Sequence, residues 1–143
     1  LGTACKLKVM TNYLATVKLT SRAEELTTMK ALGMDMNVNY EAIKASSGKA
    51  FVHETESQVI LNGSRDISFT MDLVSKDVGI FNELAKRKGL DLEIAPLIVD
   101  IFKDGEKRYG PRELSPNIIK RLEERADVEV LGEGFPSDRK SVV

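Results

Sequence analysis

The sequence predicts an all-α fold, a helical bundle built on one long N-terminal helix. Apolar residues recur at mixed three- and four-residue spacing along most of the chain, which is the period of an amphipathic helix. No stretch of useful length alternates polar and apolar residues, and 128–131 is the only short segment that resembles a strand. With 143 residues, 42% of them hydrophobic, the chain is long enough to bury one core. We therefore expect one domain over residues 1–126 and a loose C-terminal tail over 127–143.

The long helix is expected to begin near Thr3, because neither glycine nor proline interrupts the chain before Gly33. Lys30 followed by Gly33 is typical of a helix C-terminus. Caps, glycines and apolar spacing predict shorter helices at 40–46 (after a cap at Asn39), 50–61, 68–89, 93–107 and 117–126 (after Ser115 and Pro116).

Charge and composition exclude several classes of function. Lys and Arg number 21 and Asp and Glu 22, so the net charge of −1 gives no electrostatic reason to bind nucleic acid or a membrane surface. No apolar run approaches the roughly 18–20 residues that span a bilayer, and the N-terminus does not resemble a signal peptide. Cys5 is the only cysteine, so an intrachain disulfide is impossible and a reducing, cytoplasmic location is expected.

Few residues are candidates for chemistry when the sequence is considered alone. His53 is the only histidine, so a His-based triad or a His-rich metal site is not expected, and we expect this side chain at the surface or at an interface. Lys8 and Asn12 are four residues apart and share a helix face. Such a lysine acts as a general acid or base only if burial lowers its pKa, and an ordinary surface lysine is the plainer interpretation. The same holds for Lys76 and Asp77, and the segment 46–49 (Ser-Ser-Gly-Lys) fits a helix C-cap better than an anion-binding loop.

Two segments taken together resemble the signatures of the β-hydroxyacid dehydrogenase family, the 3-hydroxyisobutyrate dehydrogenase group. Residues 2–12, GTACKLKVMTN, are similar to the pattern G-x-G-x-x-x-K-x-x-x-N, except that Ala4 stands at the second glycine. Residues 69–77, FTMDLVSKD, match every fixed letter of F-x-x-x-L-x-x-K-D. The resemblance covers about residues 2–126 and implies the C-terminal helical domain of 6-phosphogluconate dehydrogenase-like enzymes. The methyl group of Ala4 limits how closely a ligand approaches the first helical turn.

The resemblance implies an enzyme that transfers a hydride between NAD or NADP and a small β-hydroxy acid. Lys8 matches the catalytic lysine, which exchanges a proton with the reacting oxygen. Asn12 matches a substrate-binding residue whose amide holds the same oxygen or the carboxylate. The remaining positions that match the family are Gly2 and Phe69 for substrate binding, Lys76 for cofactor binding and Asp77 for orienting the lysine. Since these residues fall on two helices, the resemblance requires the two helices to pack side by side.

The nucleotide-binding half of such an enzyme is not recognisable in this chain. No G-x-G-x-x-G follows a strand, so we expect an N-terminal Rossmann domain outside this sequence, which binds most of the cofactor. The chain also lacks an initiator Met, and as a fragment it is expected to be inactive by itself. The expected partners are the hydroxy acid, the Rossmann domain and a second copy in a homo-oligomer such as a dimer. A non-catalytic docking or dimerisation module is the main alternative, and the identity of the acid and the choice between NAD and NADP stay open.

Overall fold

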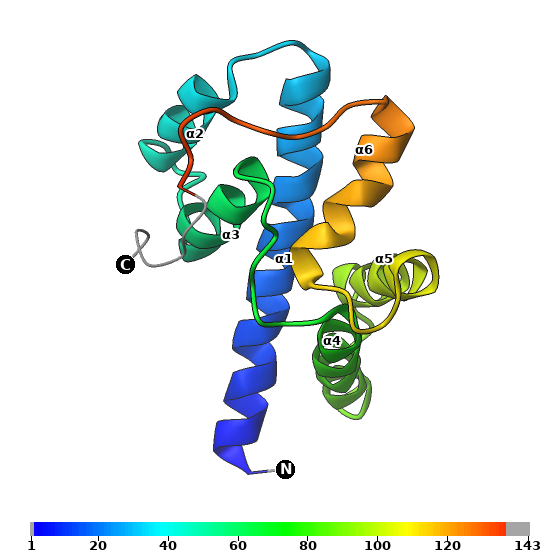
Figure 1. The fold of residues 1–143 in the computed structure, drawn as a ribbon. Coiled ribbons are helices and arrows are strands. Elements are labelled where there is room, and N and C mark those ends of the chain that lie inside the picture. The colour runs from blue at the N-terminus through cyan, green and yellow to red at the C-terminus, as the bar shows by residue number, and fades with distance from the viewer. Residues whose placement is uncertain (1, 137–143) are drawn as a thin grey trace. The chain divides into compact units, whose positions relative to one another are not determined.

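The computed structural model describes residues 2–136, and its regular structure is helical (Figure 1), which confirms the predicted fold class. In this part of the chain, β pairing is limited to an isolated antiparallel bridge between Thr70 and Leu114. The segment 128–131, which resembled a short strand in the sequence, forms no strand in the structure. The helices are α1 (Thr3–Ala31), α2 (Met36–Lys44), α3 (Phe51–Leu61), α4 (Met71–Lys86), α5 (Ile94–Tyr109), the 3₁₀ helix η1 (Ser115–Ile119) and α6 (Lys120–Ala126).

The chain divides into two compact units where the sequence suggested a single core. Unit 1 contains residues 2–17 and 69–115, and unit 2 contains 18–68 and 116–136. Helix α1 therefore supplies its N-terminal half to unit 1 and its C-terminal half to unit 2. The prediction of one long N-terminal helix is confirmed.

Unit 1 is built on the hairpin of α4 and α5, which pack along each other (Figure 1). Helix α4 begins at Met71, three residues later than the expected start at Ser68. The reason is that the preceding backbone is extended and hydrogen-bonded to the segment after α5, with Ser115 N donating to Phe69 O at 2.8 Å and Met71 N to Glu113 O at 2.9 Å. The buried apolar side chains of the hairpin are Met71, Val74, Val78, Ala95, Ile98 and Phe102.

Unit 2 packs α2, α3, η1 and α6 with the second half of α1. The cap of α2 is Asp35, whose carboxylate accepts hydrogen bonds from the backbone N–H groups of Asn37 and Val38. The predicted cap at Asn39 is wrong, because Asn39 lies inside the helix and its buried amide donates to Glu25 Oε1 at 2.8 Å. The core of unit 2 contains Leu19, Ala23, Leu26, Met36, Tyr40, Val52, Val59, Ile60, Leu61, Ile118, Ile119 and Val130.

His53 is buried in this core, so its expected position at the surface or at an interface is wrong. Its side chain is 1% exposed, and Nε2 lies 3.0 Å from the carbonyl oxygen of Tyr40. The imidazole stacks on the Tyr40 ring, with 4.5 Å between ring centroids. Burial lowers the pKa of His53, since the charged imidazolium is poorly solvated there. The residue serves packing, and the neighbouring Glu54 gave no sign of this in the sequence.

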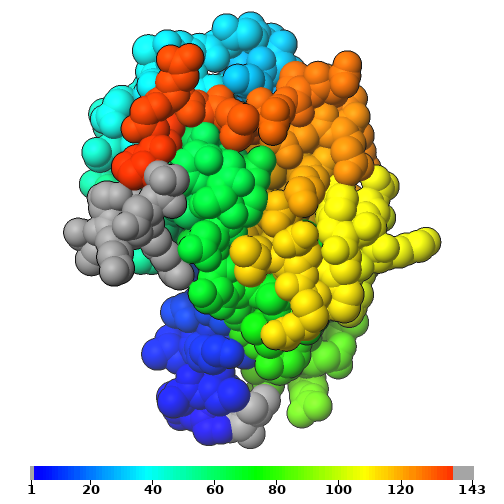
Figure 2. Space-filling view, in the orientation of Figure 1, coloured from blue at the N-terminus to red at the C-terminus, as the bar shows by residue number. Residues whose placement is uncertain are grey.

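Residues 127–136, expected to be part of a loose tail, lie instead against the α1 and α3 segments of unit 2. Lys30 Nζ donates to Leu131 O at 3.1 Å, and Gly132 N donates to Leu61 O at 2.9 Å. Val130 is fully buried. The orange-to-red segment consequently passes over the surface towards α2 (Figures 1 and 2). The rest of the predicted tail, 137–143, lies outside the described residues.

Glu123 connects this segment to α6 and to the loop after α3. Its Oε1 accepts hydrogen bonds from Arg65 Nη2 at 3.0 Å and from Val130 N at 2.8 Å. The side chains of Arg65 and Glu123 are only 10% and 11% exposed. Arg65 also adopts a left-handed backbone with φ of 55°, which a non-glycine residue adopts only when its surroundings hold it there.

We predict that Glu123→Ala lowers the free energy of unfolding by about 3 kcal/mol, because a buried guanidinium loses its partner. Urea unfolding of the chain, followed by circular dichroism, measures the change. The matched control is Glu124→Ala, whose side chain lies at the surface and whose loss should cost less than about 0.5 kcal/mol. Equal losses in the two variants would contradict a structural role for the Arg65–Glu123 pair.

The burial of Glu56 leads us to predict that the free energy of unfolding depends on pH. Burial raises its pKa to about 7, and its Oε2 has no hydrogen-bond partner within the described residues. The pKa in the folded state exceeds the unfolded value, so protonated Glu56 contributes to the free energy of unfolding. This contribution is fully present below pH 4.5 and is lost as the pH rises through about 7. We expect Glu56→Gln to remove this loss and to be more stable than wild type at pH 8 by about 2 kcal/mol. Thermal unfolding between pH 5 and 8 tests this; a wild-type profile in Glu56→Gln, like that expected for the exposed Glu24→Gln, would contradict it.

Candidate active site

The predicted site residues on α1 and α4 meet at one buried carboxylate in unit 1. Lys8 Nζ lies 3.0 Å from Asp77 Oδ2, and Asn12 Nδ2 donates to the same oxygen at 2.6 Å. The side chain of Asp77 is 3% exposed. The two helices that bear the signatures therefore pack against each other, as the resemblance requires.

The packing of α1 on α4 explains why these side chains meet. Val9, next to Lys8, is buried, and Tyr13, next to Asn12, stacks on Phe81 with ring centroids 4.2 Å apart and planes 13° apart. Phe81 lies one helical turn after Asp77, so both residues face α1. The aromatic stack holds the relative register of the two helices. Sequence reasoning missed Tyr13 and Phe81; their four-residue offsets from Val9 and Asp77 were the available signal.

The electrostatics of the site depend on Asp77. A carboxylate that leaves water is costly unless charged or polar donors replace its hydration, and here two donors converge on one oxygen. The side chain of Lys8 is 58% exposed, so its ammonium is anchored at one side and open to solvent at the other. Lys8 is exposed and Asn12 is partly exposed, so both side chains reach solvent.

The other predicted site residues lie in unit 1 but make no hydrogen bond or ion pair with Lys8, Asn12 or Asp77 within residues 2–136. Phe69 is partly exposed and lies in the extended segment before α4, not on the helix as predicted. Lys76 is exposed, and no ion pair involves it in the described chain. Gly2 is exposed beside the first turn of α1, and a Cβ atom built on it meets nothing within 4 Å, so this backbone is open to a ligand.

The segment 46–49 is a helix end, as its preferred interpretation predicted. Ser46 N donates to Ile43 O, Lys49 N to Ser46 O, and Gly48 N to the Ser46 hydroxyl. These three amides are occupied within the turn and are not directed at a ligand. Among the described residues, no group of three or more His, Cys, Asp and Glu side chains is arranged to hold a metal ion.

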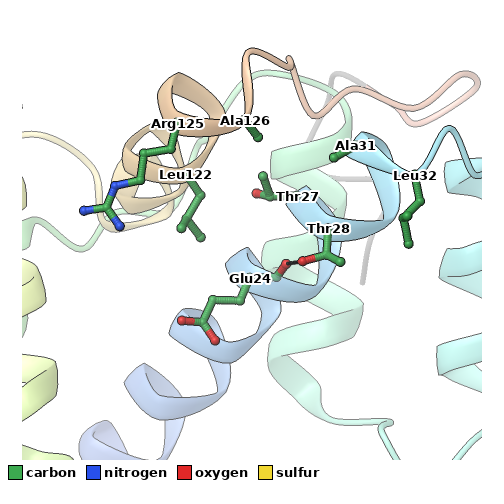
Figure 3. Close-up of a pocket in the computed structure, with 8 residues that line it drawn as sticks. All are labelled: Glu24, Thr27, Thr28, Ala31, Leu32, Leu122, Arg125 and Ala126. Atoms are coloured by element: carbon green, nitrogen blue, oxygen red, sulfur yellow. Dashed lines mark hydrogen bonds between the residues drawn. The ribbon is translucent and has the colours of Figure 1, made fainter.

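Unit 2 contains a groove of about 550 Å³ between α1 and α6 (Figure 3). Leu122 of α6 points towards α1, and the Thr28 hydroxyl donates to its own helix at Glu24 O (Figure 3). No residue predicted to bind substrate or cofactor lines this groove. Its lining residues are Glu24, Thr27, Thr28, Ala31, Leu32, Leu122, Arg125 and Ala126.

The candidate site residues of unit 1 include charged and amide hydrogen-bond donors. The exposed ammonium of Lys76 suits a phosphate oxygen, and the Lys8 ammonium and Asn12 amide suit neutral or anionic oxygen acceptors.

No helix in the described part of the chain is long and apolar enough to cross a membrane.

The fold is helical, and a lysine and an asparagine of α1 meet a buried aspartate of α4. This combination defines the class of the chain as the helical domain of the β-hydroxyacid dehydrogenase family. Residues 2–122 match the family described as NAD-binding of NADP-dependent 3-hydroxyisobutyrate dehydrogenase. The chain belongs to this family. The resemblance inferred from the two signatures is confirmed, and with it NAD or NADP as the cofactor of the family.

Individual relatives agree with the family. The chain is 29% identical over 132 residues to 2-(hydroxymethyl)glutarate dehydrogenase of Eubacterium barkeri, covering 92% of this chain and 44% of that protein. It is 22% identical over 120 residues to L-threonate dehydrogenase of Haemophilus influenzae, covering 84% of this chain and 40% of the relative. The chain thus spans less than half the length of these relatives.

Solved structures share the fold. The crystal structure of 3-hydroxyisobutyrate dehydrogenase from Salmonella typhimurium superposes with a TM-score of 0.74 at 22% identity, covering 80% of this chain and 40% of that one. The Mycobacterium tuberculosis 3-hydroxyisobutyrate dehydrogenase with L-serine gives a TM-score of 0.72 at 20% identity, covering 81% and 42%.

We predict that Lys8 and Asp77 are energetically coupled through the contact described above. Asp77→Ala should lower the free energy of unfolding by about 2 kcal/mol and Lys8→Ala by about 1 kcal/mol, because charge-assisted hydrogen bonds are lost. The double variant should be no less stable than Asp77→Ala alone, which urea unfolding measures as a coupling of about 1 kcal/mol. The exposed pair Lys86–Glu83 is the control cycle and should couple by less than about 0.5 kcal/mol. Additive losses for Lys8 and Asp77 would show that the contact contributes nothing.

Proposed function

We propose that this chain is the catalytic helical domain of an NAD(P)-dependent dehydrogenase that acts on a small β-hydroxy acid of the 3-hydroxyisobutyrate type. The observation that carries the proposal is the convergence of Lys8 and Asn12 on Asp77. A module used only for docking gives no reason for a lysine and an amide on one helix to share a buried carboxylate on another. The family match and the dehydrogenase relatives support the same choice.

Lys8 is the general acid–base residue of the proposed reaction. During oxidation its amine takes the proton of the substrate hydroxyl, and during reduction its ammonium returns that proton to the carbonyl oxygen. The nicotinamide cofactor, when bound, accepts or supplies the hydride. A positioned acid–base group of this kind contributes about 10²–10⁴-fold to the rate.

Asn12 and Asp77 prepare the lysine for this task. Asp77 restricts the ammonium to one side of the seam and holds the Asn12 amide through the same oxygen. The remaining polar atoms of Asn12 then bind the reacting oxygen or the substrate carboxylate. Phe69 forms a wall of the substrate site, Gly2 leaves space for the acid beside the first turn of α1, and Lys76 binds the cofactor.

The substrate class is supported by what the relatives are named for. 2-(Hydroxymethyl)glutarate and 3-hydroxyisobutyrate both bear a hydroxymethyl group next to the carbon that carries the carboxylate, and L-serine has the same arrangement. We propose that this chain recognises the shared unit, a carboxylate and a hydroxyl on neighbouring carbons. The side chain of the acid is selected by residues beyond this unit.

The proposal includes a nucleotide-binding Rossmann domain in the full-length protein, N-terminal to this chain, and assembly into a homo-oligomer. Leu7, Met10 and Leu14 form an apolar stripe on α1 and are 61%, 45% and 56% exposed. A stripe of this kind on a helix is usually covered by another body. Without the Rossmann domain, the chain by itself is expected to be inactive.

We predict that Lys8→Ala in the full-length protein lowers kcat by about 10²–10⁴-fold while the Kd for cofactor stays unchanged. Absorbance at 340 nm over a panel of small β-hydroxy acids measures turnover, and cofactor fluorescence measures binding. The control is Lys6→Ala, an exposed lysine of the same helix, which should change kcat less than about threefold. Full turnover in Lys8→Ala would show that Lys8 is not the acid–base residue. If the wild-type protein bound neither NADH nor NADPH, the proposal that it is a dehydrogenase would be refuted.

A further inference from the structure

A second cationic side chain lies on the face of α4 that bears Lys76. Arg112, in the turn after α5, has its Nη1 3.3 Å from Asp72 Oδ2. Asp72 and Lys76 are four residues apart on α4, so they occupy neighbouring turns of one helix face. Arg112 and Lys76 are therefore neighbours in unit 1, although they are far apart in the sequence.

The contact with Asp72 holds Arg112 in place but occupies only one of its guanidinium nitrogens. The other oxygen of Asp72 accepts hydrogen bonds from the Thr70 hydroxyl and from Leu73 N, which fixes the carboxylate that Arg112 contacts. The side chain of Arg112 is 74% exposed, and its Nε and Nη2 make no hydrogen bond within residues 2–136. Two donors of a planar guanidinium are thus presented to solvent, in the geometry that suits phosphate or carboxylate oxygens.

The start of α4 offers no backbone site for the same anion. Met71 N donates to Glu113 O at 2.9 Å and Asp72 N to Pro111 O at 3.0 Å, so these amides are already occupied. An anion on this face would be bound by the side chains of Arg112 and Lys76. Within the described residues, Asp72 is the carboxylate paired with Arg112, and Lys76 makes no ion pair.

The position of this face relative to Lys8 identifies the ligand. Successive residues of an α-helix turn by about 100° and rise by about 1.5 Å, so Lys76 lies about 100° around α4 from Asp77, and Asp72 is displaced by about 7.5 Å along its axis. The partly exposed side chains of Leu73 and Ile80 lie between these two faces. A small hydroxy acid held at Lys8 is too short to reach the face of α4 that bears Lys76 and Arg112 as well. A dinucleotide, whose nicotinamide and phosphates are separated by a ribose, is long enough.

We propose that Arg112, together with Lys76, binds phosphate groups of the dinucleotide cofactor. The inference rests on the proposed function, because it places the nicotinamide end at Lys8. Arg112 adds a bidentate donor to the single charge of Lys76, and Asp72 holds that donor in place before the cofactor arrives. The same cations would bind either the diphosphate that NADH and NADPH share or the 2′-phosphate that only NADPH has.

The test is the equilibrium Kd of the full-length protein for NADPH and NADH, measured by nicotinamide fluorescence at two salt concentrations. Arg112→Gln should raise the Kd about three- to tenfold and weaken its dependence on salt. The matched control is Arg108→Gln, since Arg108 is an exposed arginine of unit 1 that is paired with Asp104 at 2.9 Å. It should leave both values unchanged, and equal melting temperatures would confirm that both variants fold.

Each outcome has a separate meaning. A rise for both cofactors supports binding to the diphosphate, and a rise for NADPH alone supports binding to the 2′-phosphate. An unchanged Kd in Arg112→Gln, or a rise as large in Arg108→Gln, overturns the inference and leaves the role of Lys8 intact. If the wild-type protein binds neither cofactor, the proposed function and this inference both fail. Weaker binding in Arg112→Gln together with full turnover in Lys8→Ala would refute only the acid–base assignment.

Discussion

The arrangement of the site depends on the single buried oxygen of Asp77 that accepts hydrogen bonds from both Lys8 and Asn12. An unpaired carboxylate at 3% exposure would be strongly destabilising, so the folded state of unit 1 requires donors at this point. The same requirement draws the lysine and the amide into a fixed relation. In the proposed mechanism, this one contact both stabilises the fold of unit 1 and positions Lys8 for catalysis.

Apolar and aromatic packing makes this polar contact possible. The stack of Tyr13 on Phe81 fixes how α1 lies against α4, and buried Val9 adds contact beside Lys8. A rotation of α1 by one residue would move Lys8 by about 100° and separate it from Asp77. The catalytic proposal thus depends on the packing of Val9, Tyr13 and Phe81 as well as on the polar side chains.

Sequence reasoning succeeded where local patterns decide the outcome. The long α1 followed from an uninterrupted helical stretch. The pairing of Lys8 with Asp77, which are 69 residues apart, followed instead from the resemblance to the family, whose two signatures require these residues to meet. It failed where distant segments decide. Ser68 could not be recognised as lying outside α4, because the extended backbone before Met71 is held by the segment at 113–115. His53 looked like a surface residue because its partner, the carbonyl of Tyr40, belongs to another helix.

The central claim is that Lys8 and Asn12 hold the reacting oxygen of a hydroxy acid. The most direct measurement is a crystal structure of the full-length protein with cofactor and a β-hydroxy acid bound. We expect the substrate hydroxyl about 3 Å from Lys8 Nζ, with Asn12 in contact with the acid and Asp77 still bound to both side chains. A substrate bound elsewhere, with the Lys8 ammonium directed to solvent, would contradict it.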